Sequence, residues 1–252
     1  MDGRTPPRWA PLETELAHWQ QAGAVARLWL RDDDAVSVTP ALGRLAGLCA
    51  TFEVPYLIAA IPSRAGRDLA ERLACEPLAE AAAHGWTHQN HAGSGPKAEF
   101  PIDRPEPEIL DALTSARTRI DELFGPKAVP IYVPPWNRIA TDVEELLPEA
   151  GFRAVSTIGR SSGAHPALRR VNVHLDIIDW HGSRGCRSAD MLAAELAEHL
   201  ALSRENGRPA IGVLTHHLDH DEAAWRFLEE LFQESVGHVA VCWVSASQLL
   251  ER

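Results

Sequence analysis

Carboxylate and imidazole side chains gather in a few short segments of this sequence, and these residue types suit metal binding and hydrolysis. Asp32, Asp33 and Asp34 directly follow the apolar run AVARLWLR. Like charges a few ångströms apart repel one another and raise one another's pKa. A solvated turn or a bound cation would offset this repulsion, and the triplet alone is more typical of a solvated turn.

A second chemical cluster is the run HGWTHQNH. His84 and His88 are four residues apart, which places both rings on one side of a helical turn or tight loop. Two imidazoles and one carboxylate form a facial ligand set for a divalent transition metal and leave positions open for water and substrate. The alternative is a helix cap with one buried imidazole. Because imidazole suits zinc, cobalt, nickel or iron better than magnesium, we expect a transition metal here.

Short β-branched runs alternate with longer segments rich in alanine, leucine and glutamate. We expect strands at residues 24–31, 54–61, 81–86, 129–133, 153–157, 171–179, 209–216 and 238–244. We expect helices at residues 39–52, 64–80, 107–125, 141–151, 189–206 and 221–235. This alternation predicts an α/β fold with parallel strands and helices outside. No glycine-rich phosphate loop follows the first strand, which favours a closed or nearly closed barrel in one domain, residues 1–252.

Five of the expected strands end in polar clusters, and in barrels of this kind the chemistry lies at the carboxyl ends of the strands. The residues at these ends are Asp32, Asp33, Asp34, His84, His88, His91, Trp136, Asn137, Asp176, Asp179, Trp180, His216, His217, Asp219, His220 and Asp221. One such strand end means little. Five at the same end of one sheet predict a functional site.

Bulk composition narrows the class of partner. The formal net charge of -11 argues against binding to nucleic acid or to anionic membrane surfaces. No apolar run reaches the roughly 18 residues of a membrane span. The amino-terminal segment lacks the apolar region of a signal peptide, and the four cysteines form no CxxC pair. We therefore expect a cytoplasmic protein with reduced thiols, while its oligomeric state stays open.

Five short motifs resemble those of the polysaccharide deacetylase family (NodB homology, carbohydrate esterase family four), in the family's order. RDDDA is similar to T-F-D-D-G, HGWTH to H-[ST]-x-x-H, and YVPPWN to F-R-P-P-Y. DIIDW matches D-x-x-D-W, and LTH matches L-x-H. Each motif is weak alone, but together and in order they span residues 31–216, which is most of the chain.

The resemblance implies a distorted or incomplete NodB-type (β/α) barrel with about seven or eight mostly parallel strands. It implies one divalent metal held by Asp34, His84 and His88, with zinc expected first and cobalt, nickel, manganese or iron as alternatives. It implies Asp33 as general base and His216 as general acid. Family members remove acetyl groups from N-acetylated sugars, so the expected activity is metal-dependent amide hydrolysis on a glycan or small-molecule substrate.

Other residues next to the motifs complete the expected site. We expect Asp176 and Asp179 in the catalytic group. Indole rings stack well on sugar rings, although tryptophans at these positions could equally serve barrel packing. The residues expected to contact substrate are Trp86, Trp136, Asn137, Trp180 and Arg31.

The sequence departs from the family pattern at two positions. The third motif's arginine, which in the family orients the base, is Val133 here. Arg31 or Arg138 could supply a guanidinium, and we expect Arg31 to pair with an acidic residue, because a strand end fixes its position better than a loop fixes Arg138. Gly85 stands where the family has serine or threonine, and Thr87 could supply the missing hydroxyl.

Two other functions compete with hydrolysis of this kind. The run THHLDHD is similar to the H-x-H-x-D-H run of metallo-β-lactamases, but Leu218 occupies the second histidine's place. The missing arginine would also suit a barrel that binds carbohydrate without catalysis. Asp33 and His216 argue against this second alternative, because a binding protein needs neither base nor acid beside a metal.

Overall fold

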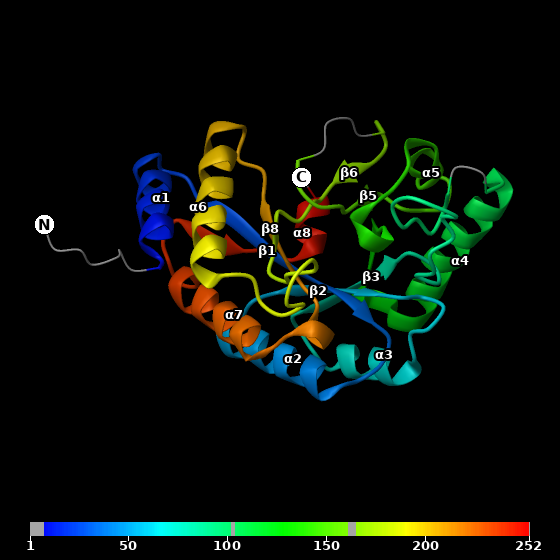
Figure 1. Ribbon diagram of the computed structural model, residues 1–252, viewed down its shortest axis with the longest axis horizontal. Helices are drawn as coiled ribbons and strands as arrows, with labels where there is room; N and C mark the ends of the chain where they lie inside the picture. The colour runs from blue at the N-terminus through cyan, green and yellow to red at the C-terminus, as the bar shows by residue number, and fades with distance from the viewer. Residues whose placement is uncertain (1–7, 102–103, 161–164, 252) are drawn as a thin grey trace, which may run out of the picture.

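The computed structural model describes residues 8–101, 104–160 and 165–251, and these form one curved parallel sheet with helices on its outer face (Figure 1). The strands lie in the order β6-β5-β4-β3-β2-β1-β8-β7, and β9 pairs with the start of β1. Their bounds are β1 Ala26–Ala35, β2 Tyr56–Ala60, β3 Ala79–His84, β4 Ala128–Val133, β5 Ala154–Val155, β6 Arg169–Arg170, β7 Leu175–Asp176, β8 Ile211–Thr215 and β9 Val241–Trp243. The expected distorted barrel of parallel strands is confirmed.

The segment between β6 and β7 joins the two edges of this open barrel. On one side, the Val171 amide donates to the carbonyl of Val155 in β5, and the Val173 amide donates to the carbonyl of Thr157 just after β5. The next amide, of His174, donates to the Gly212 carbonyl on β8 at 2.7 Å. One continuous segment therefore bridges the gap, although the expected strand at 171–179 is reduced to β7 and isolated bridges at Val173 and Ile178.

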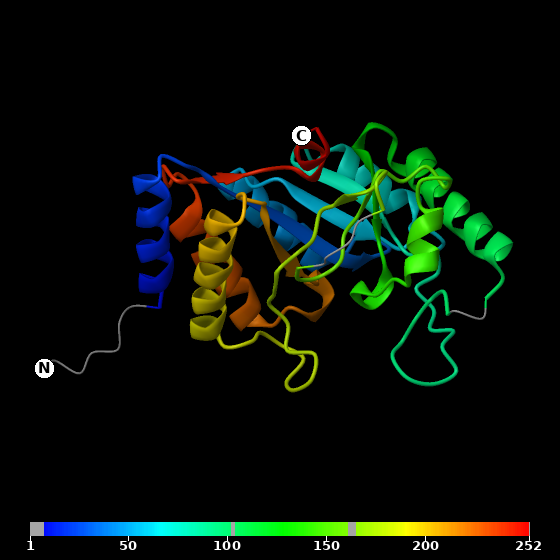
Figure 2. The same ribbon diagram turned by 90° about the horizontal axis from the view of Figure 1, so that it is seen from above.

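Helices follow most strands and pack on the outer face of the sheet, as Figures 1 and 2 show. Their bounds are α1 Ala10–Gln21, α2 Pro40–Phe52, α3 Arg67–Ala74, α4 Glu106–Phe124, α5 Thr141–Leu146, α6 Ala189–Glu205, α7 Glu222–Ser235 and α8 Ala246–Leu250. The ends of α2 and α4 are set by local sequence. The Thr39 hydroxyl caps α2 by accepting from the Leu42 amide at 3.0 Å. Gly125, with φ 51°, ends α4.

Two hydrophobic layers hold these elements together. The larger layer lies between the sheet and the outer helices, and the smaller one fills the barrel interior. Trp29, Ile131 and Val173 belong to the interior layer, and Ala246 and Leu250 of α8 are buried in it. Alpha-helix α8 thus closes the amino-terminal end of the barrel. No helix in the described residues is long and apolar enough to cross a membrane.

Candidate metal and catalytic site

An irregularity in β1 brings two adjacent aspartates to one site. Asp33 of β1 pairs with Ala59 of β2, and Ala35 pairs with the next residue of β2, Ala60. Asp34 therefore has no partner on β2 and forms a bulge. Asp34 also has a φ of 75°, in the left-handed region. Strict alternation would place the two carboxylates on opposite faces, and the bulge removes that obstacle. The three aspartates lie within the strand, beyond its expected end at residue 31.

Asp34, His84 and His88 form a candidate metal site, with ligand atoms all within 4.8 Å of one another. The Asp34 Oδ1 atom lies 3.2 Å from Nε2 of His84 and 3.3 Å from Nε2 of His88. These are the three residues that the sequence predicts as ligands. They come from the bulge of β1, the end of β3 and the loop after it.

The hydrogen bonding of His84 fits a cation at this position. Its Nδ1 atom lies 3.0 Å from the Val133 carbonyl, which can only accept, so Nδ1 carries a proton. In the neutral ring Nε2 then presents a lone pair toward Asp34, whose buried Oδ1 has no hydrogen-bond partner among the described residues. A cation between these two acceptors would bind both, and a histidine whose other ring nitrogen donates to a carbonyl is usual at metal sites.

The charges of the site act on its own titratable groups. Burial alone would raise the pKa of Asp34, but the neighbouring His84 and His88 outweigh burial and lower that pKa far below its usual value. Burial alone would lower the pKa of His84, but Asp33 and Asp34 outweigh it and raise that pKa. Both carboxylates therefore act on the same imidazole. Burial, followed by the charge of His84, lowers the pKa of His88.

Glu99 organises the loop that carries the second histidine. Its buried carboxylate accepts hydrogen bonds from the amides of Trp86, Thr87 and His88 at 3.0, 2.6 and 2.9 Å, and from the Thr87 hydroxyl at 2.9 Å. Four donors to one carboxylate fix the loop firmly. Glu99 was not predicted, because it lies in the loop after β3 and outside all five motifs.

The same carboxylate explains the glycine in the second motif. Gly85 has a φ of +63°, and a Cβ atom there would lie 2.1 Å from Oε2 of Glu99 and 2.6 Å from Cγ of Pro135. Serine or threonine cannot fit without displacing both neighbours. The Thr87 hydroxyl, expected to replace the missing one, donates to Glu99 and accepts from the Gln89 amide.

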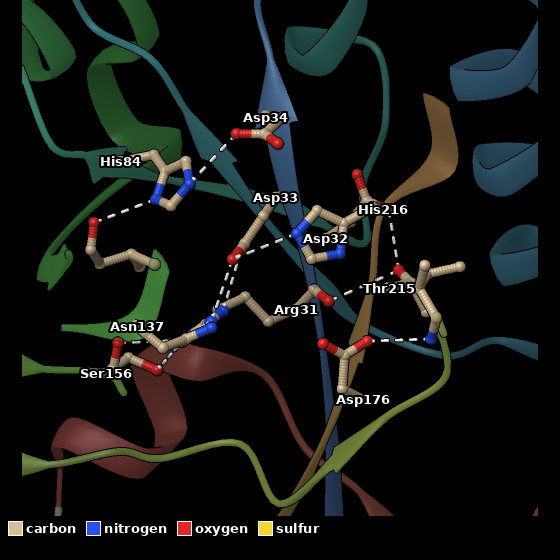
Figure 3. A network of polar contacts seen from close by, with 12 residues as sticks. Arg31, Asp32, Asp33, Asp34, His84, Asn137, Ser156, Asp176, Thr215 and His216 are labelled. Atoms are coloured by element: carbon tan, nitrogen blue, oxygen red, sulfur yellow. Dashed lines mark hydrogen bonds and ion pairs between the residues drawn. The ribbon is translucent and has the colours of Figure 1, made fainter. Parts of the chain in front are cut away.

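Arg31 pairs with the expected base, Asp33. Its Nε atom lies 2.9 Å from Asp33 Oδ1, and its Nη2 atom donates to Oδ2 at 3.0 Å (Figure 3). The guanidinium also donates to Oγ of Ser156 at 2.7 Å and to Oδ1 of Asn137 at 2.5 Å. The expected pairing of Arg31 with an acidic residue is confirmed, while Arg138 is exposed and forms no ion pair within the described ranges.

Two residues expected at the substrate have a different place in the structure. Arg31 is fully buried, and its donors are used by Asp33, Ser156 and Asn137. The side-chain oxygen of Asn137 is directed at that guanidinium. Both residues therefore orient Asp33 from behind. Ser156, which follows β5, also binds the Arg31 guanidinium, and none of the five motifs predicts it.

His216 lies on the other side of Asp33. Its Nε2 atom is 4.0 Å from Asp33 Oδ2, and its ring meets the Trp180 ring edge-on with centroids 4.6 Å apart. The Trp180 indole donates to Asp176 Oδ2 at 2.8 Å. Asp176 also accepts from the Ile178 amide at 3.0 Å, and burial is the main cause of its raised pKa. Asp176 thus fixes the indole that packs on His216.

Trp136 forms a wall beside the candidate metal ligands. Its ring centroid lies 4.8 Å from that of His88, and Nζ of Lys97 lies 5.6 Å from the indole centroid. Trp136 has a φ of 55°, an unusual conformation for a non-glycine residue. Trp86 is half-buried and packs against the outer core.

Comparison with known proteins gives a structural likeness only. No family model matches the sequence, and no curated protein matches it. A Mycobacterium smegmatis protein described as a polysaccharide deacetylase superposes with a TM-score of 0.65 at 20% identity, covering 91% of this chain and 90% of that one. The peptidoglycan N-acetylglucosamine deacetylase Bc1960 superposes with a TM-score of 0.58 at 17% identity, covering 90% of this chain and 89% of that one. A family 4 acetyl xylan esterase from Clostridium thermocellum, in complex with a cobalt ion, superposes with a TM-score of 0.55 at 14% identity. The match covers 89% of this chain and 90% of that one.

The fold is that of the carbohydrate esterase family four deacetylases. The similar structures span most of this chain and include deacetylases and an esterase. They also include a mutant of BA3943, described as a family-four pseudoenzyme, with a TM-score of 0.59 at 15% identity, covering 90% of this chain and 67% of that one. The family-four fold therefore does not by itself establish catalysis.

Asp179, which the sequence predicts in the catalytic group, binds the turn that follows it. The oxygens of Asp179 accept from the amides of Gly182 and Ser183 at 3.0 and 3.1 Å. A Cβ atom at Gly182 would lie 2.3 Å from Asp179 Oδ2, so the turn closes tightly on this carboxylate. Asp179 thus shapes the loop after Trp180, and its membership of the catalytic group stays a prediction.

Asp32 faces away from Asp33 and braces the strand that carries His216. It accepts from the Thr215 hydroxyl and the His217 amide, both at 2.8 Å, and contacts Nδ1 of His217 at 2.5 Å. Asp32 and His217 are both fully buried. His220 lies in the helix layer, where its ring meets that of Trp225 edge-on. The three aspartates therefore differ in their contacts. Asp32 binds Thr215 and His217, Asp33 is the candidate base, and Asp34 is a candidate metal ligand.

Proposed function

We propose that this protein is a metal-dependent amide hydrolase that removes an acetyl or similar acyl group from an N-acylated amino sugar. One observation supports this most. Asp33, held from behind by Arg31, lies beside the Asp34–His84–His88 set, and His216 is 4.0 Å away on its other side. A base candidate, an acid candidate and a cation site thus converge at one end of the barrel.

Asp34, His84 and His88 would hold one divalent transition metal, and zinc is our first choice for its identity. A metal bound there supplies Lewis acidity, which polarises an acyl carbonyl and acidifies water. The donor set of two imidazoles and one carboxylate leaves coordination positions open. The similar acetyl xylan esterase was solved with a cobalt ion.

Asp33 is placed to take a proton from the attacking water. The guanidinium of Arg31 contacts both oxygens of that carboxylate and holds it in position, as a general base requires. A bond forms between the water oxygen and the acyl carbon, and the carbon–nitrogen bond breaks. His216 donates a proton to the departing nitrogen, so the products are a carboxylate and an amine. Trp136 and Trp180 would flank the sugar and acyl group.

Product release from N-acetylglucosamine, its short oligomers and an acetate ester tests this function, with zinc or cobalt supplied. We expect acetate release that depends on metal, with about one metal per chain by elemental analysis. Asp33→Asn and His216→Ala should keep fold and metal but lose turnover by about 10²-fold or more. His84→Ala should lose the metal, while the exposed His91→Ala should keep it. Undiminished turnover in Asp33→Asn would refute the assignment.

A carbohydrate-binding barrel without catalysis is the second candidate, favoured by the structural likeness to a described pseudoenzyme. It predicts that parent and Asp33→Asn bind oligosaccharide with equal affinity and that neither releases acetate. Titration calorimetry alongside the acetate assay separates the two functions.

A further inference from the structure

A second group of cationic side chains lies at the other end of the barrel from Asp33. Arg27, Arg160, Arg169 and Trp29 line a pocket of about 530 Å³, here called the basal pocket, to which α8 contributes Leu249. This volume is within the usual range for small-molecule sites. Figure 2 shows α8 on the side of the molecule opposite the long loop that follows β3.

The basal pocket is separate from the catalytic site. Arg27 and Asp33 lie on the same strand, β1, and the rise of a strand over that span is about 20 Å. None of the residues that line the pocket belongs to the candidate metal site or to the Arg31 network. A ligand bound there would therefore be distinct from the substrate.

The charged side chains that line the basal pocket are all cationic. Its described lining contains four arginines and no carboxylate. Arg170 is bound by Glu144, whereas Arg27, Arg160 and Arg169 form no ion pair within the described ranges. In a chain with a net charge of -11, three unpaired guanidinium groups in one pocket create a local positive potential.

The donors of these groups are largely unused. Arg27 and Arg169 each donate one hydrogen bond of 3.5 Å, to the carbonyls of Arg208 and Leu249. Such long bonds are weak. Trp29 is buried and lines the same pocket, with its indole nitrogen close to Gly212. A Cβ atom at Gly212 would lie 2.5 Å from that nitrogen, so the glycine makes room for the indole.

We propose that the basal pocket binds a small phosphate-bearing anion. Guanidinium groups present planar pairs of N–H donors that match phosphate oxygens, and each arginine stays charged at all relevant pH values. A multiply charged phosphate offsets the repulsion among three like charges better than a singly charged carboxylate does. This site is independent of the proposed deacylation, because the two share no residue.

Titration calorimetry with pyrophosphate and with inorganic phosphate tests the proposal, using the metal-loaded full chain at low ionic strength. We expect saturable binding of one pyrophosphate per chain, weaker binding of phosphate, and no measurable binding of acetate. Arg27→Gln and Arg169→Gln should each weaken pyrophosphate binding about tenfold. The matched control is Arg226→Gln, an exposed arginine on α7, which should change the affinity less than twofold.

Controls separate the basal pocket from the metal site, where pyrophosphate could also bind. His84→Ala should bind pyrophosphate as tightly as the parent, and Arg169→Gln should retain the parent's acetate release and circular dichroism. The proposal is overturned by an absence of saturable binding, by acetate binding as tightly as pyrophosphate, or by equal affinities of Arg169→Gln and Arg226→Gln. Tenfold weakening in His84→Ala alone would also overturn it, since binding would then belong to the metal site.

Discussion

Arg31 shows how one side chain can take over the role of another from a different strand. The family's third motif supplies its arginine from the strand that here ends in Val133, whereas Arg31 lies on β1, two residues before the carboxylate that it contacts. Arg31 contacts both oxygens of Asp33, so that carboxylate has a guanidinium partner without an arginine at position 133. The proposed role of Asp33 as base thus keeps a guanidinium partner, although that partner comes from a different strand.

Replacing Arg31 tests this arrangement. Arg31→Ala leaves the buried Asp33 without a counter-charge, which should cost about 3–5 kcal/mol of unfolding free energy and most of the activity. Arg31→Lys should restore only part of both, because lysine cannot contact both carboxylate oxygens. Arg138→Ala, at an exposed position, is the control. Urea denaturation and acetate release measure the effects, and parent-like stability in Arg31→Ala would contradict the buried pair.

At the scale of elements, local backbone irregularities position the site. Asp34, His88, Trp136 and Asn137 all have positive φ, and they lie in the bulge of β1 and in the segments that follow β3 and β4. Such conformations cost about 1–3 kcal/mol each and persist where surrounding contacts hold them. Periodicity predicts most elements within a few residues, but it cannot show these bends. This is why the sequence alone could not explain how Asp33 and Asp34 share a site.

Gly85 is a position where the family's usual residue should fail in this chain. Gly85→Ser would place a Cβ atom against Glu99 and Pro135 at a positive φ, with an expected cost of about 1–3 kcal/mol. Displacing Glu99 would free the His88 loop, so metal affinity should fall as well. Gly43→Ser is the control, because nothing lies within 4 Å of a Cβ atom there. Thermal unfolding and metal titration measure both effects, and an unchanged metal affinity would show that Glu99 does not fix the loop.

The buried Asp32–His217 pair links β1 to the end of β8 and should make stability depend on pH. Burial alone would raise the pKa of Asp32 and lower that of His217, but their mutual attraction outweighs burial and reverses both shifts. The Asp32 contribution is lost as pH falls below its ordinary value of 3.8. The His217 contribution is complete below its ordinary value of 6.5 and is lost as pH rises through the raised pKa.

His217→Gln should therefore destabilise the protein most between these two ordinary values, 3.8 and 6.5. The difference in unfolding free energy from the parent should shrink as pH rises above that window, because the parent then loses the charged pair. Urea denaturation at a series of pH values measures it. His238→Gln, outside the pair, is the control, and a pH-independent difference would rule out the charged pair.

For the whole molecule, the order of the five motifs predicted the barrel and the metal ligands, because these residues lie in or beside regular strands. Glu99 and Ser156 could not be predicted, since each reaches the site from a segment far away in the sequence. A closed or nearly closed barrel was predicted, but not the way its two edges are bridged, because the segment after β6 pairs with two strands in turn. Helix α1 was missed although Leu12, Leu16 and Trp19 are spaced for one buried helical face.

The chain should unfold as one unit, because α8 at its carboxyl-terminal end closes the barrel that begins with β1. Leu250 is buried with Trp29 and Ile131 in the barrel interior. Leu250→Ala should thus lower the unfolding free energy by about 2–5 kcal/mol, while Val239→Ala, at an exposed position, should change it little. In the parent and in Leu250→Ala alike, metal release and the loss of the helical circular dichroism signal should have the same denaturant midpoint. A separate early transition for metal release would show that the two ends of the barrel are not cooperatively coupled.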